Sequence, residues 1–209
     1  MRPASLIVVF AASSLGACAG MSAEQCQLAD WETVGFEDGA RGATGEHIAV
    51  HRKSCAKAGV TPDRHAYEAG RAQGLESYCV PAKGYQAGSG GERYNGVCRA
   101  HNETDFLRAF ESGREHYKLR SEVDRLASRI EYEHRRSERL RDKIAGAERD
   151  LVEGDMDRDQ RQALLDNLKE YSHDLGKSEQ KLRQLQYELG AAELALESFE
   201  ERSYAASLW

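Results

Sequence analysis

Two long heptad patterns of apolar residues dominate the second half of the chain, and they restrict its fold more than any other feature. The first runs in steps of three and four from Leu119 to Leu151, and eight of its ten positions are apolar. The second runs from Leu164 to Phe199, with ten of eleven positions apolar or aromatic. Such spacing is typical of helices that pack along one face. No proline interrupts either run, so each predicts one continuous helix.

Residues 152–160, which include Gly154 and three Asp residues, separate the two runs. If the chain folds back there, the two apolar faces meet in antiparallel order. The residue numbers of the two members of each facing pair then sum to 315. Ser137 then faces Ser178, so the polar position of one helix meets the polar position of the other. A buried polar layer specifies the register of such a pair. We therefore expect an antiparallel coiled-coil hairpin over residues 117–200.

The first half of the chain differs in composition, because fifteen of the 19 glycines lie at or before Gly113. Its pattern is mostly helical, which predicts an all-α protein with a small helical module at residues 18–116 before the hairpin. We expect the tail 201–209 to return to the base of the hairpin, with Trp209 packed on the module. A net charge of −6 argues against a nucleic-acid partner, which would require a basic surface.

The N-terminus has the features of a secretion signal. Arg2 precedes a run of small and apolar residues from Ala4 to Leu15, which is too short for a permanent membrane helix of ~20 residues. The run ends in Leu15-Gly16-Ala17-Cys18, which resembles the bacterial lipoprotein cleavage box. The resemblance implies that residues 1–17 are a signal peptide and that an acylated Cys18 anchors the chain in the membrane. The alternative is an ordinary signal peptide, cut near Ala17 or Ala19.

The residue that follows Cys18 indicates to which membrane the lipoprotein is sorted. In sorting of the enterobacterial type, Ala19 rather than Asp at this position resembles an outer-membrane signal. We therefore expect the protein in the inner leaflet of the outer membrane, facing the periplasm.

Four cysteines remain after Cys18, and an even number in an oxidising compartment predicts two disulfides. Three pairings are possible. Local order favours Cys26–Cys55 and Cys79–Cys98, because the first two predicted helices would lie antiparallel and bring Cys26 beside Cys55. A zinc site is the weaker interpretation, since the cysteines form no C-x-x-C motif.

The module carries a degenerate repeat of the form aromatic-Glu-x-Gly. Its three copies are Phe36-Glu37-Asp38-Gly39, Tyr67-Glu68-Ala69-Gly70 and Phe110-Glu111-Ser112-Gly113. Glycines four residues apart, such as Gly35 with Gly39 and Gly70 with Gly74, weaken a helix by ~1 kcal/mol each. We therefore expect them to permit close helix–helix or aromatic contact.

Residues 82–97 are predicted to form a Gly-rich loop closed by a disulfide, with Tyr85 and Tyr94 packed back onto the helices. No strand, following helix or Lys-Ser/Thr ending accompanies the loop, so a phosphate-binding loop is disfavoured. If the module has a ligand pocket, we expect it at this loop and the repeat faces. The candidate residues for that pocket are Glu37, Gly39, Glu68, Gly70, Glu111, Gly113, Tyr85 and Tyr94.

An ordered set of these motifs resembles a bacterial lipoprotein family known only as domain of unknown function 2799. The resemblance spans roughly residues 24–130. It rests on the four cysteines and on Gly35-Phe36-Glu37-Asp38-Gly39, Tyr67-x-x-Gly70-Arg71-x-x-Gly74, Tyr94-Asn95-Gly96-Val97-Cys98 and Phe110-x-x-Gly113. Phe36 departs from the tyrosine that is more usual in the family. The resemblance implies an envelope lipoprotein and brings no activity.

Two metal patterns are present and both are weak. Asp155, Asp157, Asp159 and Asp166 have the spacing of a calcium loop, but Gln160 occupies the glycine position. We expect instead that Asp157 caps the second long helix, with Gln160 completing a capping box. His47, His51 and Cys55 share one helix face, but an oxidised Cys55 cannot bind a metal. We therefore predict neither metal nor cofactor.

These observations favour a structural or protein-interaction role mediated by the hairpin, with a protein partner in the envelope or a second copy of the chain. No catalytic motif is evident. The alternatives are a cell-envelope enzyme that uses Glu37, Glu68 or Glu111 as acid or base, and a small-ligand binder at the Gly-rich loop.

Overall fold

The computed structural model describes the backbone of residues 20–207 and the side chains of residues 20–204. Within this range the chain forms helices and loops but no strand, which confirms the all-α prediction. The predicted signal peptide, Cys18 and the packing of Trp209 lie outside the described residues. The chain forms two compact units, and each is described separately. Unit 1 is the chain up to Val80 with Tyr94–Thr104, and unit 2 is Pro81–Arg93 with the chain from Asp105 onward.

Unit 1 is built from short helices whose first residues are capped by side chains. Asp30 caps α2 by accepting a hydrogen bond from the Glu32 amide. Asp63 caps α4 by accepting hydrogen bonds from the amides of His65 and Ala66. The helices of unit 1 are α1 (Ala23–Gln27), α2 (Trp31–Ala40), η1 (Gly45–His47), α3 (Ile48–Cys55), η2 (Ala56–Ala58) and α4 (Arg64–Tyr78).

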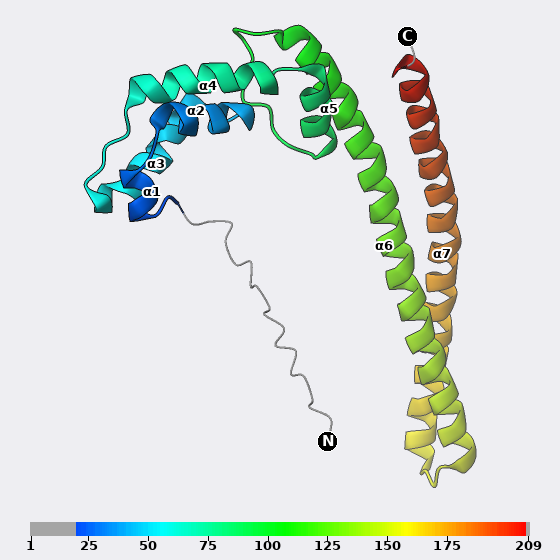
Figure 1. The fold of residues 1–209 in the computed structure, drawn as a ribbon. Helices are drawn as coiled ribbons and strands as arrows, with labels where there is room; N and C mark the ends of the chain where they lie inside the picture. The colour runs from blue at the N-terminus through cyan, green and yellow to red at the C-terminus, as the bar shows by residue number, and fades with distance from the viewer. Residues whose placement is uncertain (1–19, 208–209) are drawn as a thin grey trace, which may run out of the picture. The chain divides into compact units, whose positions relative to one another are not determined.

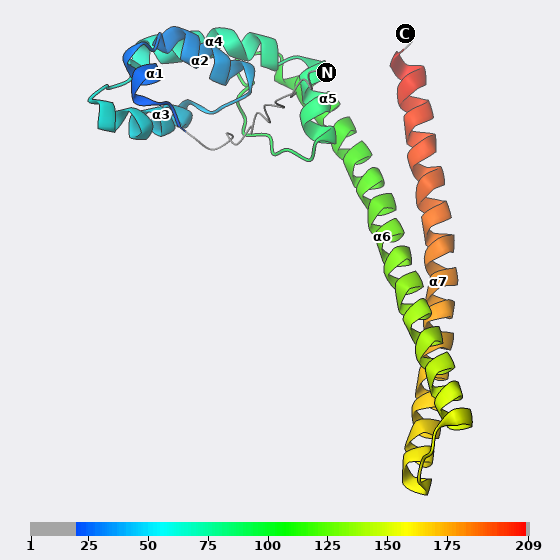
Figure 2. The ribbon, with the colours of Figure 1, turned by 60° about the horizontal axis from the view of Figure 1, so that its bottom comes forward.

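Helices α2 and α4 cross in direct backbone contact and lie side by side in both views (Figures 1 and 2). A Cβ atom added at Gly35 would overlap the carbonyl oxygen of Tyr67, and one added at Gly70 would overlap that of Glu32. Gly39 and Gly74 are equally restricted. The predicted role of the paired glycines in close helix–helix contact is therefore confirmed.

Both predicted disulfides are present, with Cα–Cα distances of 5.5 Å for Cys26–Cys55 and for Cys79–Cys98. The reasoning behind the first pair was only partly correct. Cys26 lies on the separate helix α1, and the main partner of α2 is α4. Residues 48–58 form α3 and η2 and end at Gly59, whose φ is 69°.

In unit 2, residues Pro81–Ser89 form helix α5, so the prediction of a loop over 82–97 is wrong for its first half. The glycines there serve helix packing. Cβ atoms added at Gly84 and Gly88 would collide with the backbone of Phe106 and Phe110 on helix α6 (Glu103–Glu153). A fourth aromatic-x-x-Gly copy, Tyr85-Gln86-Ala87-Gly88, therefore lies on α5.

The α5–α6 crossing repeats the α2–α4 crossing of unit 1. Gly39 and Gly88 each accept a bond from a glycine three residues later, Gly42 or Gly91, and both of these later glycines have φ 75°. A Cβ at Gly74 would meet Phe36 and Ala40, and one at Gly113 would meet Tyr85 and Ser89. Gly113 therefore corresponds to Gly74 and not to Gly70. The third repeat copy is one helical turn out of the register that the sequence suggested.

Helices α6 and α7 (Arg158–Ser207) run antiparallel as a long hairpin (Figure 1). The Ser137 hydroxyl donates to the Ser178 hydroxyl over 3.0 Å, which confirms the predicted register. At the turn, the Gln160 amide donates to Asp157 and the Asp157 amide donates to Gln160, as the predicted capping box requires. The expected boundary at residues 116–117 falls inside α6, and α7 continues through the predicted tail as far as Ser207.

Among the described helices, none combines the length and the apolar character that crossing a membrane would require.

Candidate functional site

A buried carboxylate lies at the centre of unit 1. Asp38 belongs to the last turn of α2 and is only 1% exposed, because the α2–α4 crossing holds it against Tyr67. Gly35 and Gly39 flank it in sequence and fix the approach of the two helices. A carboxylate at such a position is costly to bury unless other groups supply hydrogen bonds.

Three side chains supply those bonds. The Tyr67 hydroxyl donates to Oδ2 of Asp38 over 2.8 Å, and Arg41 donates to Oδ1 over 2.6 Å. The Nε2 atom of His51 lies 2.7 Å from Oδ2. Burial by itself would raise the pKa of Asp38, but the hydrogen bonds from His51, Tyr67 and Arg41 outweigh it and hold the pKa below its ordinary value. The carboxylate is therefore ionised at neutral pH.

A second imidazole faces the same oxygen. His47 ends η1, one helical turn before His51, and its Nε2 lies 3.9 Å from Oδ2 of Asp38. The two imidazole rings meet edge to face with centroids 5.3 Å apart. His47 and His51, which the sequence placed on one helix face, are thus brought together with Asp38, a residue that the sequence analysis did not propose as a ligand.

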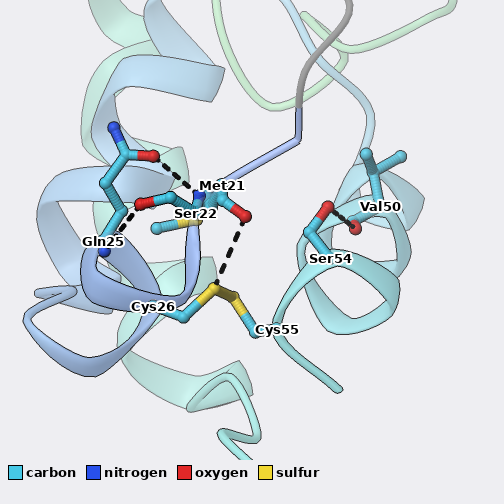
Figure 3. The surroundings of a disulfide bond; sticks show 7 residues. All are labelled: Met21, Ser22, Gln25, Cys26, Val50, Ser54 and Cys55. Atoms are coloured by element: carbon cyan, nitrogen blue, oxygen red, sulfur yellow. Dashed lines mark hydrogen bonds between the residues drawn. A yellow bond between two sulfur atoms is a disulfide. The ribbon is translucent and has the colours of Figure 1, made fainter. Parts of the chain in front are cut away.

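The Cys26–Cys55 disulfide holds α3 in place next to this cluster (Figure 3). Cys55 is the last residue of α3, one turn after His51, and it is completely buried. The other sulfur belongs to α1, whose first turn carries a capping box between Ser22 and Gln25. The disulfide therefore links the helix that carries His51 to α1, and oxidation of Cys55 removes it as a ligand.

A cavity of about 540 Å³ adjoins the cluster. Asp38, Arg41 and His51 form one side of it, and Glu37 also lines it. The remaining wall comes from α1 and its flanks and from α2, through Met21, Glu24, Gln25, Leu28 and Val34. Of the residues that the sequence proposed for a pocket, Glu37 is the one that borders this cavity.

The other proposed residues lie elsewhere. Glu68 faces outward and pairs with Arg64 at 2.6 Å, while Glu111 lies 3.7 Å from Arg114 on an exposed face of α6. Gly39, Gly70 and Gly113 belong to helix crossings or their flanks. Tyr94 donates to Glu103 and accepts a bond from the Cys98 amide. The glycines therefore serve helix packing and Tyr94 serves loop closure, whereas Glu68 and Glu111 form surface ion pairs.

Tyr85 borders a different cavity, of about 630 Å³, within unit 2. Its hydroxyl lies 2.9 Å from Nδ1 of His116, and Nε2 of His116 lies 3.2 Å from Glu200 on α7. His116 also stacks on Phe199 with centroids 5.7 Å apart. This chain of contacts joins α5, α6 and α7, so Tyr85 acts in the packing of unit 2.

Residues 30–115 match the model of a protein family described as "Protein of unknown function (DUF2799)". This segment is therefore similar to the DUF2799 family. The match covers Asp38, His47, His51 and Tyr67, and it ends within α6, before most of the hairpin. No curated protein and no solved structure matched the chain in the corresponding comparisons.

Within residues 30–115, the sequence pattern did not single out Asp38 or Tyr67 as site residues, because both lie inside copies of the aromatic-Glu-x-Gly repeat. The signal for Asp38 was the variable x position of the repeat. The first copy has Asp38 at this position, whereas the other copies have Ala69, Ser112 and Ala87. A carboxylate where the other copies have small residues indicates a function specific to the first copy.

Proposed function

We propose that the chain is a lipid-anchored protein of the bacterial cell envelope that binds a protein partner through its helical hairpin. The anchor is inferred from the sequence at Leu15-Gly16-Ala17-Cys18 and from the two disulfides, which form in oxidising compartments such as the periplasm. We place the anchor in the inner leaflet of the outer membrane because Ala19 follows Cys18. Several acyl chains on one residue give firm attachment, because each buried CH₂ contributes about 0.8 kcal/mol.

The hairpin has the properties of a rigid arm. Helices of 51 and 50 residues, rising about 1.5 Å per residue, extend more than fifty ångströms. Leu126, Leu182 and Leu185 are buried between them. The Ser137–Ser178 hydrogen bond fixes the register, so the turn at the far end of the hairpin is held at a defined distance from its base.

The turn itself carries the observation on which the proposal rests. Val152 is 85% exposed and lies within residues 150–159, which contain five acidic residues and one arginine, for a net charge of −4. An exposed apolar side chain in a mostly acidic segment is suited to a partner with a basic surface and an apolar recess.

Photo-crosslinking in cells tests the partner. A photoreactive amino acid at Val152 should give a specific adduct with an envelope protein. The same amino acid at Ser172, exposed on the side of α7, serves as the matched control. Absence of a specific adduct at Val152, or equal capture at Ser172, would overturn the proposal that the turn binds a partner. An adduct of twice the chain's mass would identify the partner as a second copy.

The anchor has a separate test. Mass spectrometry of the mature N-terminus should show an acylated Cys18, and Cys18→Ala should release the protein from the membrane fraction. An unmodified N-terminus near Ala17 or Ala19 would instead establish an ordinary signal peptide. The two experiments are independent, because crosslinking at Val152 does not depend on how the chain is attached.

A further inference from the structure

The helix crossing by itself does not require the polar cluster at Asp38. In the α5–α6 crossing, Ala87 occupies the position of Asp38 and Phe106 occupies that of Tyr67, judged by the glycines that flank them. Ala87 is 4% exposed and Phe106 is completely buried, so apolar residues fill the same crossing in unit 2. The polar pair in unit 1 therefore serves something other than helix packing.

We propose that Asp38, His47 and His51 bind a divalent transition-metal ion, with zinc the best match. One oxygen of Asp38 and one nitrogen of each imidazole all lie within 4.8 Å of one another. Both imidazoles direct Nε2 to the same oxygen, Oδ2, at 2.7 Å and 3.9 Å. A tetrahedral zinc ion with bonds of about 2.0–2.1 Å separates its ligand atoms by about 3.3 Å, and the two distances bracket that value.

The ligand types select the metal. Two imidazoles and one carboxylate suit zinc and neighbouring transition metals, whereas calcium and magnesium prefer oxygen ligands alone. A spacing of four residues places His47 and His51 on one face of a helical segment, as in many zinc sites. Cys55 cannot be the third ligand because it is oxidised. The third ligand is instead Asp38, which belongs to a different helix, α2.

The surrounding groups support the ligands. Tyr67 donates to the carboxylate and Trp31 lies 6.3 Å from the His51 ring, measured between centroids, so the orientation of both ligands is restricted. Such partners orient metal ligands and raise affinity. The positive charge of Arg41 opposes a cation, but Arg41 binds Oδ1 and its side chain is 68% exposed. Oδ2 accepts a hydrogen bond from Tyr67 and, as a carboxylate oxygen, keeps a further lone pair for the metal.

Three protein ligands leave a coordination position for water or an exogenous group. The 540 Å³ cavity lies next to that position, since Asp38 and His51 form part of its wall. Arg41 and Glu37 also line it, so a ligand with both anionic and hydrogen-bonding groups could approach the ion. The proposal concerns unit 1 and is independent of the hairpin's role.

Metal titration of the full chain tests the site. After treatment with a chelator, calorimetry with Zn²⁺ should show one equivalent bound, and Co²⁺ should give the visible absorption of a low-coordinate site. His47→Ala should weaken Zn²⁺ binding at least about tenfold. The side chain of His47 is 42% exposed, and its Nε2 lies 3.9 Å from Oδ2 of Asp38. The His47→Ala variant should therefore remain folded.

Two further variants make the outcome decisive. Tyr67→Phe keeps all three ligands and should weaken Zn²⁺ binding about 10–100-fold through the loss of carboxylate orientation. His65→Ala removes an exposed histidine of α4 and should leave binding unchanged. Absence of a stoichiometric zinc equivalent in the wild-type chain would overturn the proposal. So would a folded His47→Ala variant that binds Zn²⁺ as tightly as the wild type.

Discussion

The hydroxyl of Ser137 on α6 donates a 3.0 Å hydrogen bond to the hydroxyl of Ser178 on α7, and both residues are 1% exposed. Ser178 in turn donates to the carboxylate of Glu133 over 2.7 Å. The polar layer of the hairpin is therefore a short chain of bonds in which Ser178 is the central member.

Substitution in this layer should be asymmetric. Ser178→Ala removes the donor to Glu133 and the acceptor for Ser137, and should lower the free energy of unfolding by about 1–3 kcal/mol. Ser137→Ala leaves the Ser178–Glu133 bond in place and should cost about 1 kcal/mol. Urea unfolding of the two variants measures the difference. Equal effects would show that Glu133 is satisfied without Ser178.

Glycine substitutions should have opposite effects at a helix crossing and at an open position. Gly70→Ala places a methyl group on the Glu32 carbonyl oxygen and should destabilise the protein by about 2 kcal/mol or more. Gly176→Ala lies in the middle of α7 with no atom within 4 Å, and should stabilise it by about 0.5–1 kcal/mol. Thermal unfolding checks both signs, and a neutral Gly70→Ala would contradict the backbone contact.

Loss of the Cys26–Cys55 disulfide should destabilise unit 1. The two cysteines are 29 residues apart, and closure of a loop of that length contributes roughly 3–4 kcal/mol in the chain-entropy model. The double variant Cys26→Ser/Cys55→Ser isolates this effect, with hydrogen exchange of α3 amides as the readout. If α3 keeps wild-type protection, the disulfide does not hold that helix.

Alkaline pH should weaken the fold at Tyr94. Burial, together with the hydrogen bond to Glu103, raises the pKa of Tyr94 from 10.0 to about 12. Because the folded-state pKa lies above the unfolded value, this contribution is complete below pH 10 and is lost as pH rises toward 12. Unfolding by urea between pH 8 and 11.5 should show a smaller loss in Tyr94→Phe than in the wild type.

Neutralisation of the outward-facing glutamates should change little. Glu68→Gln and Glu111→Gln remove exposed ion pairs with Arg64 and Arg114, and each should alter the free energy of unfolding by less than about 0.5 kcal/mol. Circular dichroism and urea unfolding test this. A large loss of stability would mean that these glutamates make contacts beyond their ion pairs.

The hairpin could be predicted closely because its information is local and periodic. The heptad positions specify which faces are apolar, and one polar serine at a heptad position of each helix specifies which residues meet. The capping box at Asp157 and Gln160 was equally local. Both disulfide pairs were also predicted, although the helix that carries Cys26 was not.

The candidate metal site could not be predicted because its ligands come from separate helices. His47 and His51 were visible as a pair, but Asp38 joins them only through the packing of α2 against α4 and of α3 nearby. Residues 82–89 were predicted as part of a loop because five glycines between residues 82 and 97 usually indicate one. Contact with α6 outweighs that local preference, since Gly84 and Gly88 let the two backbones meet.

The glycine crossing of α2 and α4 has a mechanical consequence. With no side chain between the two backbones at Gly35 and Gly70, neither helix can rotate or slide along the other without steric collision. The two helices are therefore expected to move as one body, and Asp38 and Tyr67, joined by a 2.8 Å hydrogen bond, move with them. A ligand that binds beside Asp38 therefore acts on two closely packed helices rather than on a single flexible helix.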